Sequence, residues 1–292
     1  MSYFSHLRKI GFYHRPFRRF PWIFLIFAIF SAIFYVRSVK KSPKSAKLFC
    51  DGDSSGARFG FTSLSVLPKI DNCIDAEDSD FSLVIYVKSI PDDSKLRNLV
   101  RETWGAQALK LGISVFFVVG RPENQKLAPD IEKNLKNENR EKADIIQGNF
   151  VDSYRNLSLR MSSIFRWHFE LQCACGPKKW VIPLILDRDV VTAPRTLLNV
   201  IGRNNLHKTK KTISGYVTER KPTIRNANSK WYMSRELYAP EFLPPFVPFA
   251  TLLSADLVPQ LYAFALSSTD KFLQDFFTEC LEFSNFSNLS SQ

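Results

Sequence analysis

Short apolar runs rich in β-branched and aromatic residues recur along the chain and predict the strands of a sheet. The clearest run, VIPLIL, ends at a polar break, which fits a strand buried on both faces of a mostly parallel sheet. Pro183 within this run has no backbone N–H and predicts an interruption of strand pairing there. The predicted strands cover residues 82–89, 113–120, 144–146, 181–186 and 212–217.

Helical spacing of apolar residues fills the intervals between these strands. A turn at residues 91–93 precedes Ser94, which can cap a helix over residues 94–110. Strand, helix and strand at this spacing are typical of a parallel βαβ unit, so the fold class is α/β. The buried stripe of this helix is predicted to consist of Leu96, Leu99, Val100, Thr103 and Trp104. Further helices are predicted over residues 127–142, from Asp152 or Ser153 onward, over 194–201 and over 268–283.

The N-terminal segment differs from the rest of the chain in charge and in hydropathy. The 17 residues 20–36 are uncharged and apolar, which is about the minimum for a membrane-spanning helix. A cleaved signal peptide and a buried core helix are the alternatives, but a long basic segment precedes the run and no small-x-small cleavage site follows it. We therefore predict a cytoplasmic tail over residues 1–19, a signal anchor over 20–36, a luminal stem over 37–80, a folded domain over 81–283 and a tail over 284–292.

The formal charge of +12 is concentrated in the same segment. Residues 1–47 contain ten of the 40 Lys and Arg residues and no Asp or Glu, so the remaining 30 basic residues nearly balance 28 acidic ones. A nucleic-acid-binding face on the folded domain is therefore not indicated. The five Cys residues show no zinc pattern and predict one or two disulfides in an oxidising compartment. Candidate N-glycosylation sequons begin at Asn156, Asn285 and Asn288.

Two carboxylates, Asp187 and Asp189, follow the central predicted strand in the order Asp-Arg-Asp. Ligands of open α/β sheets bind at the carboxyl ends of strands, where paired carboxylates suit a divalent cation that also contacts phosphate. A solvated turn is the alternative, because two Asp residues at this spacing arise often by chance. Arg97 and Arg101 are four residues apart on a helix, which suits phosphate or ribose contacts as well as a solvated face. His168 lies on an apolar helical stripe, which favours packing over metal ligation.

Several motifs in order carry a resemblance to the β-1,3-galactosyltransferase-like family of type II Golgi glycosyltransferases, which is related to the Fringe proteins. The stretch DIIQGNFVDSYRNLSLRM resembles the family's D-I-I-x-x-D-F-x-D-S-Y-x-N-L-T-L-K-T, and LDRDVV resembles K-x-D-D-D-V-F with Arg188 at the middle acidic position. LRNLVRETWG, KWYMSRELY, LPPF and QDFFTE resemble further family motifs. The match extends from about residue 82 to about residue 282.

This resemblance implies a glycosyltransferase-A fold, a Rossmann-like nucleotide half joined to an acceptor half. It implies transfer of a sugar with inversion from UDP-galactose or UDP-N-acetylglucosamine to a glycoprotein or glycolipid acceptor in the Golgi lumen. Mn²⁺ would bind Asp187 and Asp189 and assist departure of the diphosphate. The remaining roles implied are nucleotide binding by Arg97, Arg101, Asp152, Asp187 and Arg188, acceptor binding by Trp231 and Tyr232, and proton abstraction by Asp275.

The chain departs from the family pattern at three places. The glycine-rich stretch after the Pro-Pro motif reads VPFATLLS and contains no glycine, Arg188 interrupts the acidic triplet, and Glu279 replaces the glycine that ends the motif around Asp275. Asp275 itself matches the family's Asp, but it could equally be an ordinary polar-face residue of a helix. Two interpretations therefore stay open: an active luminal transferase, and a family member without catalysis that binds glycans or partner transferases. UDP binding that requires Mn²⁺ would favour the first.

Overall fold

The computed structural model describes residues 63–68, 81–153, 156–175, 180–229, 231–236, 238–243 and 246–267. The chain divides into two units, Met1–Gly52 and Asp53–Gln292, and every described residue belongs to the second. The predicted anchor at residues 20–36 and the predicted helix at 268–283 lie outside the described residues. Within the described ranges, none of the helices has both the length and the apolar character needed to span a membrane.

A seven-stranded mixed sheet forms the centre of the described unit, in the order β1-β4-β3-β2-β5-β7-β6. Strands β4, β3, β2 and β5 run parallel, whereas β1, β7 and β6 join by antiparallel pairing. The predicted α/β class and the buried central strand are confirmed, but the sheet is mixed rather than mostly parallel, since three of its described ladders are parallel and three are antiparallel. The strands are β1 (Leu64–Val66), β2 (Phe81–Lys88), β3 (Ser114–Arg121), β4 (Ile145–Val151), β5 (Trp180–Asp187), β6 (Ile213–Gly215) and β7 (Ala250–Leu253).

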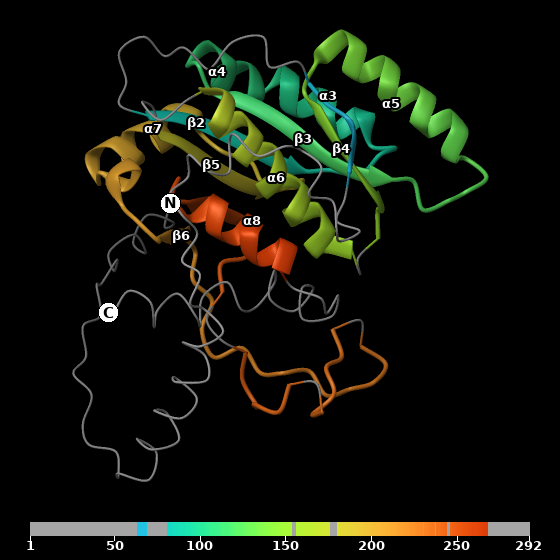
Figure 1. The fold of residues 1–292 in the computed structure, drawn as a ribbon, viewed down its shortest axis with the longest axis vertical. Helices are drawn as coiled ribbons and strands as arrows, with labels where there is room; N and C mark the ends of the chain where they lie inside the picture. The colour runs from blue at the N-terminus through green and yellow to red at the C-terminus, as the bar shows by residue number, and fades with distance from the viewer. Residues whose placement is uncertain are drawn as a thin grey trace, which may run out of the picture. The chain divides into compact units, whose positions relative to one another are not determined.

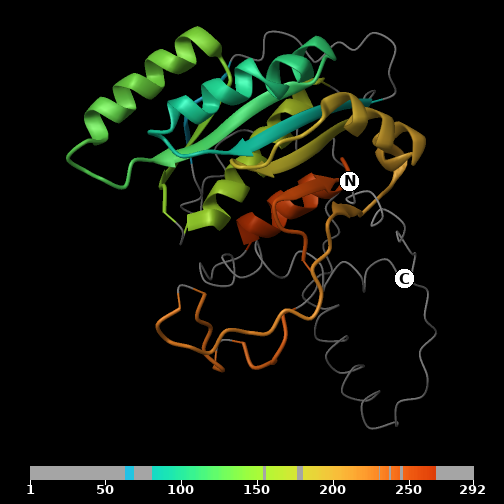
Figure 2. The same cartoon turned by 180° about the vertical axis from the view of Figure 1, so that it is seen from behind.

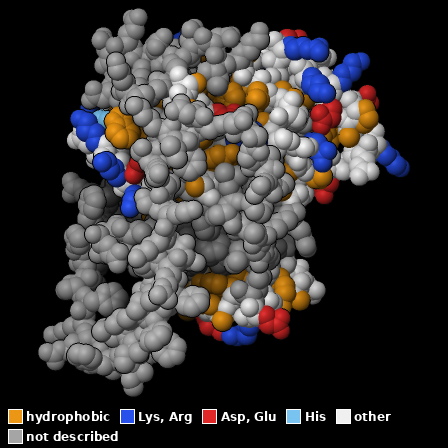
Figure 3. All heavy atoms as spheres, viewed as in Figure 1, with side chains coloured by type: hydrophobic (Ala, Val, Ile, Leu, Met, Phe, Trp, Pro, Cys, Tyr) orange, Lys and Arg blue, Asp and Glu red, His pale blue; other side chains and the backbone are white. Residues whose placement is uncertain are grey.

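Helices cover both faces of this sheet (Figures 1 and 2). One face packs against α3 (Ser94–Glu102), α4 (Trp104–Lys110) and α7 (Pro194–Arg203), and α5 (Ala128–Lys142) adds Leu135 to the same side. The other face packs against α6 (Leu157–Cys175) and α8 (Leu257–Ser267). A short 3-10 helix, η2 (Leu206–Lys208), follows α7. Basic and acidic side chains are interspersed over the region of α5 (Figure 3).

Strand β5 owes its central place to its uninterrupted apolar sequence, since residues 181–186 are all buried. Pro183 does not interrupt pairing with β2, because that ladder runs through the Val84–Pro183 pair. On the other side of β5, the ladder with β7 covers only Leu184 to Leu186, so the proline lies just outside it. The predicted interruption is therefore confined to one edge of the strand, where the missing N–H costs no ladder hydrogen bond.

The helix predicted over residues 94–110 is two helices, α3 and α4, which are separated at Thr103 (φ −106°, ψ −112°). Its N-cap is Asp93 rather than Ser94, because the Asp93 carboxylate accepts a hydrogen bond from the Leu96 N–H. Val100 and Trp104 are buried as predicted, whereas Leu99 is 55% exposed and Thr103, at the break, is exposed as well. The predicted stripe was therefore wrong at Leu99 and Thr103.

Residues 216–249 form a long excursion between β6 and β7. Two isolated bridges, Thr218 with Phe246 and Pro222 with Phe242, hold its two arms together. Because β7 runs antiparallel to β5 and begins opposite Leu186, the excursion rejoins the sheet at the carboxyl end of β5. The C-terminal end of this excursion therefore lies beside the Asp-Arg-Asp sequence.

Candidate active site

The carboxyl ends of the four parallel strands lie along one edge of the sheet. Strands β2 and β5 end in register at Lys88 and Asp187, and β3 and β4 end in register at Arg121 and Val151. Parallel sheets bind ligands at this edge, because loops diverge there and leave a crevice. Two predicted site residues, Asp152 and Asp187, stand at this edge, directly after β4 and at the last position of β5.

Asp187 is held at this edge by both its backbone and its side chain. Its backbone N–H donates to the carbonyl of Phe249 (2.8 Å), and its carbonyl accepts from the Val190 N–H (3.1 Å). Its carboxylate forms an ion pair with Lys88, whose Nζ lies 2.5 Å from Oδ1. Both side chains are partly exposed, at 24% for Lys88 and 32% for Asp187, so the pair is open to a ligand.

The next two residues, Arg188 and Asp189, lie in an exposed turn. The guanidinium of Arg188 is 48% exposed and approaches the Asp93 carboxylate at 3.6 Å. This distance is an ion pair but is too long for a hydrogen bond. Asp93 meanwhile uses its other carboxylate oxygen to cap α3, so the turn after β5 faces the N-terminus of that helix.

Asp152 lies in a buried ion pair with Arg160 of α6. The Gly120 N–H also donates to its carboxylate at 2.8 Å. Burial raises the pKa of Asp152, and the charge of Arg160 opposes that effect. Burial likewise lowers the pKa of Arg160, against the opposing charges of Asp152 and then Asp187. Arg160 is 6% exposed, and its Nε has no hydrogen-bond partner among the described residues.

Arg97, which the family resemblance assigned to the nucleotide, is buried within the protein. Its Nε and Nη2 donate to Glu138 of α5, Nη1 donates to Ser89 and Ile90, and Nη2 also donates to the Pro91 carbonyl. These bonds use all five N–H donors of the guanidinium. Arg97 therefore ties the loop after β2 to α5 and has no donor available for a nucleotide in this conformation.

Arg101 is also bound within the protein. Its guanidinium donates to Asp144 (2.8 Å), pairs with Glu138 (2.8 Å) and lies 4.9 Å from the centre of the Phe117 ring. Burial alone would lower the pKa of Arg101, but the hydrogen bonds and charges of the two carboxylates raise it. Asp144 directly precedes β4, which places this contact away from the carboxyl edge. The structure therefore does not bring Arg101 together with Asp187.

Phe249 supplies the carbonyl that accepts from Asp187, and its backbone is left-handed with φ +67°. This conformation is unfavourable for a residue with a β-carbon and is the one that glycine adopts readily. Its side chain is 59% exposed. The chain thus retains a glycine-type backbone in the stretch where the sequence has no glycine.

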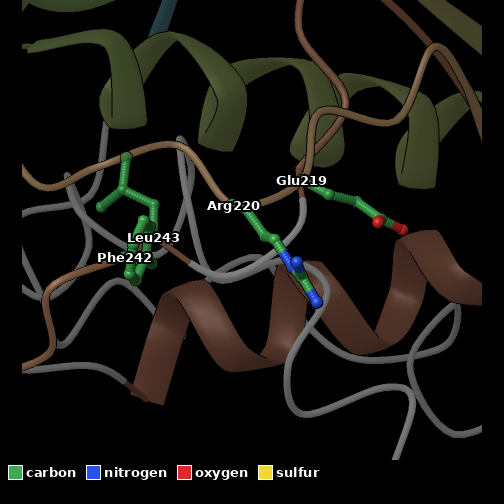
Figure 4. Close-up of a pocket in the computed structure, with 4 residues that line it drawn as sticks. All are labelled: Glu219, Arg220, Phe242 and Leu243. Carbon is green, nitrogen blue, oxygen red and sulfur yellow. The ribbon is translucent and has the colours of Figure 1, made fainter.

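The excursion carries the predicted acceptor residues Trp231 and Tyr232, which are 54% and 46% exposed. Arg225 holds the excursion together by donating to the carbonyls of Met233, Tyr238, Ala239 and Pro240. A cavity of about 450 Å³ opens at the base of the same segment. Its lining residues are Glu219, Arg220, Phe242 and Leu243, with the two charged side chains apart from the two apolar ones (Figure 4).

These contacts bear on the divalent metal expected at Asp187 and Asp189. A divalent ion on Asp187 would have to displace the Lys88 ammonium from the carboxylate, and it would share the turn with the Arg188 guanidinium. Like charges at such range repel, so Asp187 and Asp189 do not fit a divalent ion in this arrangement. Among the residues described, no group of three or more His, Cys, Asp or Glu side chains could hold a metal ion.

The other predicted site residues have different outcomes. Asp275, Asn285 and Asn288 lie outside the described residues. Asn156 is described, and its side-chain nitrogen donates to the Val151 carbonyl at 2.7 Å. Sequence reasoning missed Lys88, Asp93 and Arg160. Lys88 could have been found as the last residue of a predicted strand, since the carboxyl ends of parallel strands share one edge.

Comparison with known proteins adds to this geometry. A family model described as galactosyltransferase matches residues 95–278. The chain is 29% identical over 196 residues to mouse beta-1,3-galactosyltransferase 1, and it has the same identity to the human protein of that name. It is 32% identical over 183 residues to human UDP-GalNAc:beta-1,3-N-acetylgalactosaminyltransferase 1.

These matches cover most of this chain but a smaller share of the relatives. The matched regions amount to 66% and 62% of this chain, and to 57% and 53% of the respective relatives. The chain therefore spans little more than half the length of these relatives. The family match includes both the Asp-Arg-Asp turn and Asp275.

Proposed function

Because the chain belongs to the galactosyltransferase family, we propose that it transfers a hexose or N-acetylhexosamine from a UDP-sugar to a glycan hydroxyl in a β-1,3 linkage, with inversion. The two relatives are named for galactosyl and N-acetylgalactosaminyl transfer, which supports a UDP-hexose or UDP-N-acetylhexosamine donor. We propose that the fold is of the glycosyltransferase-A type. The single observation that carries the proposal is the polar edge formed by Lys88, Asp152, Arg160 and Asp187 at the ends of the parallel strands.

The proposed reaction exchanges one bond for another at the anomeric carbon. The bond from this carbon to the β-phosphate oxygen breaks, and its electron pair leaves with UDP. An acceptor hydroxyl oxygen forms the new bond from the opposite face, which inverts the configuration, and its proton passes to a base. The reaction therefore needs a base on one side of the sugar and positive charge near the diphosphate on the other.

Asp275 is the proposed base, on the strength of the family resemblance in the motif around it. A positioned base contributes roughly 10²- to 10⁴-fold to rate. Trp231 and Tyr232 are the proposed acceptor contacts, because exposed aromatic faces can pack on the apolar faces of sugar rings. Their excursion rejoins the sheet beside Asp187, which would bring an acceptor close to the donor.

We propose that the folded domain faces the Golgi lumen and is anchored by residues 20–36. The disulfide at Cys173 supports an oxidising compartment, since such bonds are rare in the cytosol. Endoglycosidase digestion and protease protection in sealed microsomes test this topology. Digestion of the large domain by protease added outside the vesicles would refute it.

A second candidate function is favoured by the exposed Phe249 side chain. Its carbonyl accepts from the Asp187 N–H, so its backbone adjoins the Asp-Arg-Asp turn, and its side chain is exposed in a stretch where the family pattern is rich in glycine. A ring that blocks the donor would leave a protein that binds glycans without transferring sugar. The full-length chain should be incubated with UDP-galactose, UDP-N-acetylglucosamine and UDP-N-acetylgalactosamine and a panel of glycan acceptors.

The proposed transferase would be supported if the wild type forms a β-1,3-linked product. Asp275→Asn should then lower the turnover by at least two decades while the affinity for UDP stays unchanged. Glycan binding without any product from the three donors would favour the second candidate. Asp275→Asn is informative because it keeps the size of the side chain while removing the basic carboxylate.

A further inference from the structure

Three cations lie around the Asp-Arg-Asp turn. Lys88 contacts Asp187 directly, Arg188 is part of the turn itself, and Arg160 is near enough for both Asp187 and Arg188 to influence its pKa. They come from β2, from the turn after β5 and from α6, so the fold brings together three segments that are distant in sequence. If Asp187 and Asp189 held a divalent metal ion, the presence of three protein cations around the same turn would be unexplained.

Two of these cations have hydrogen-bond donors to offer a ligand. The Lys88 ammonium has three N–H donors, and its described ion pair is with Asp187 alone. Arg188 is half exposed, and its 3.6 Å approach to Asp93 leaves its planar fork without a hydrogen bond there. A guanidinium fork matches the geometry of phosphate oxygens, and an ammonium acts on them as a compact charge.

We propose that this protein neutralises the diphosphate of its nucleotide donor with Lys88 and Arg188 in place of a divalent metal ion. This inference rests on the proposed function at the same site. As the bond to the anomeric carbon breaks, negative charge grows on the β-phosphate oxygen that keeps the electron pair. Charge-assisted N–H donors already positioned at that oxygen stabilise the leaving group as a metal ion would. Asp187 then orients Lys88, and Asp93 lies beside Arg188, so the carboxylates hold the two cations instead of ligating a metal.

Arg160 is assigned a positioning role in this arrangement. It is buried against Asp152, so it does not compete with Lys88 for the Asp187 carboxylate, and its charge adds to the positive field at the strand ends. The pair also explains why a buried carboxylate at the end of β4 is tolerated, since it is compensated by a guanidinium and by the Gly120 N–H.

The test is UDP binding by the full-length chain, measured by titration calorimetry in EDTA and again in Mn²⁺. The inference predicts that the affinity in EDTA equals that in Mn²⁺ within about threefold. Lys88→Gln and Arg188→Gln should each weaken binding by roughly tenfold or more, because each removes a charge-assisted bond to phosphate. Lys142→Gln is the matched control. Lys142 is exposed at the C-terminus of α5 and lies near the amino end of β4, opposite the carboxyl edge, so this substitution should leave UDP binding unchanged.

Arg188→Asp provides the sharpest comparison. It replaces the cation by a third carboxylate, so binding in EDTA should fall by at least tenfold, and Mn²⁺ should restore it. Thermal unfolding of each variant without ligand separates loss of binding from loss of folding, and the exposed Arg188 should tolerate both substitutions.

The outcomes distinguish this inference from the proposed function. UDP binding by the wild type only when Mn²⁺ is present would overturn the inference and leave the proposed transferase intact. Absence of UDP binding under both conditions would overturn the proposed function together with the inference. Metal-independent binding that survives both Gln substitutions would also refute the inference, because the cations responsible would then be others.

Discussion

His168 makes the stability of this protein sensitive to pH in a predictable direction. The side chain lies on α6 against the central strands and is 1% exposed. Its Nε2 lies 3.1 Å from the Val181 carbonyl, which can only accept, so Nε2 carries the proton. Nδ1 then accepts from the Tyr86 hydroxyl at 3.0 Å. This pair of contacts fixes a neutral imidazole and confirms the expectation that His168 packs rather than ligates a metal.

Burial lowers the pKa of His168 from 6.5 to about 4, and the hydrogen bond to Val181 opposes this only in part. The unfolded chain therefore binds a proton at higher pH than the folded protein does. The contribution of His168 to stability is complete above pH 6.5 and is lost as the pH falls from 6.5 towards 4. One pKa unit corresponds to about 1.4 kcal/mol, so the loss amounts to about 3 kcal/mol.

Thermal unfolding of the wild type and of His168→Gln at several pH values measures this effect. The difference between the two curves removes the contribution of other groups, such as Asp152, whose raised pKa acts in the opposite direction. For a domain of this size the melting temperature of the wild type should fall by roughly 6–12 °C more than that of the variant. Tyr86→Phe should keep most of the pH dependence, because burial and not the hydroxyl is the main cause. Parallel curves for the wild type and His168→Gln between pH 6.5 and 4 would refute this reasoning.

Three further predictions concern residues that hold the fold. Arg97→Met should lower the free energy of unfolding by about 3 kcal/mol, since the Glu138 carboxylate and the Ile90 and Pro91 carbonyls lose their donor. A reduced urea midpoint at unchanged slope would show it. Gly148→Ala should cost about 1–3 kcal/mol by the same assay, because the added β-carbon would collide with the Phe150 ring and the Ser163 hydroxyl. Phe249→Gly should gain roughly 0.5–1 kcal/mol by relieving the left-handed backbone, whereas Phe249→Ala keeps the strain and should gain nothing.

The buried strands could be predicted because their signal is local. A run such as VIPLIL has no polar face, so it fits only a strand covered on both sides, and β5 takes that place. The break between α3 and α4 could not be predicted in this way, since nothing in the composition around Thr103 forbids a helix. Helix α8 was missed because its sequence is apolar almost throughout and has no contrasting polar face.

The partners of the two arginines of α3 could not be predicted from the sequence. Arg97 and Arg101 four residues apart are compatible with an anion-binding fork, and the pattern alone cannot name the anion. In the structure the anions are Glu138 and Asp144, which lie about forty residues further along the chain and meet the fork through the packing of α5 and β4. Burial alone would raise the pKa of Glu138, but the hydrogen bonds and charges of Arg97 and Arg101 hold it below its usual value. A partner provided by tertiary packing leaves no trace in local spacing.

Phe249 presents the reverse case, in which the sequence change was visible but its consequence was not. The sequence has no glycine in this stretch, yet the backbone of Phe249 keeps the left-handed geometry at a cost of roughly 1–2 kcal/mol. Strain of this kind persists only where neighbouring contacts enforce it. Here the Phe249 carbonyl accepts from Asp187, and pairing of β7 with β5 begins at the next residue. These two contacts fix the Asp-Arg-Asp turn and enforce a backbone conformation at residue 249 that its phenylalanine side chain disfavours. The contacts that position Asp187 therefore determine the conformation here, and the side chain at residue 249 does not.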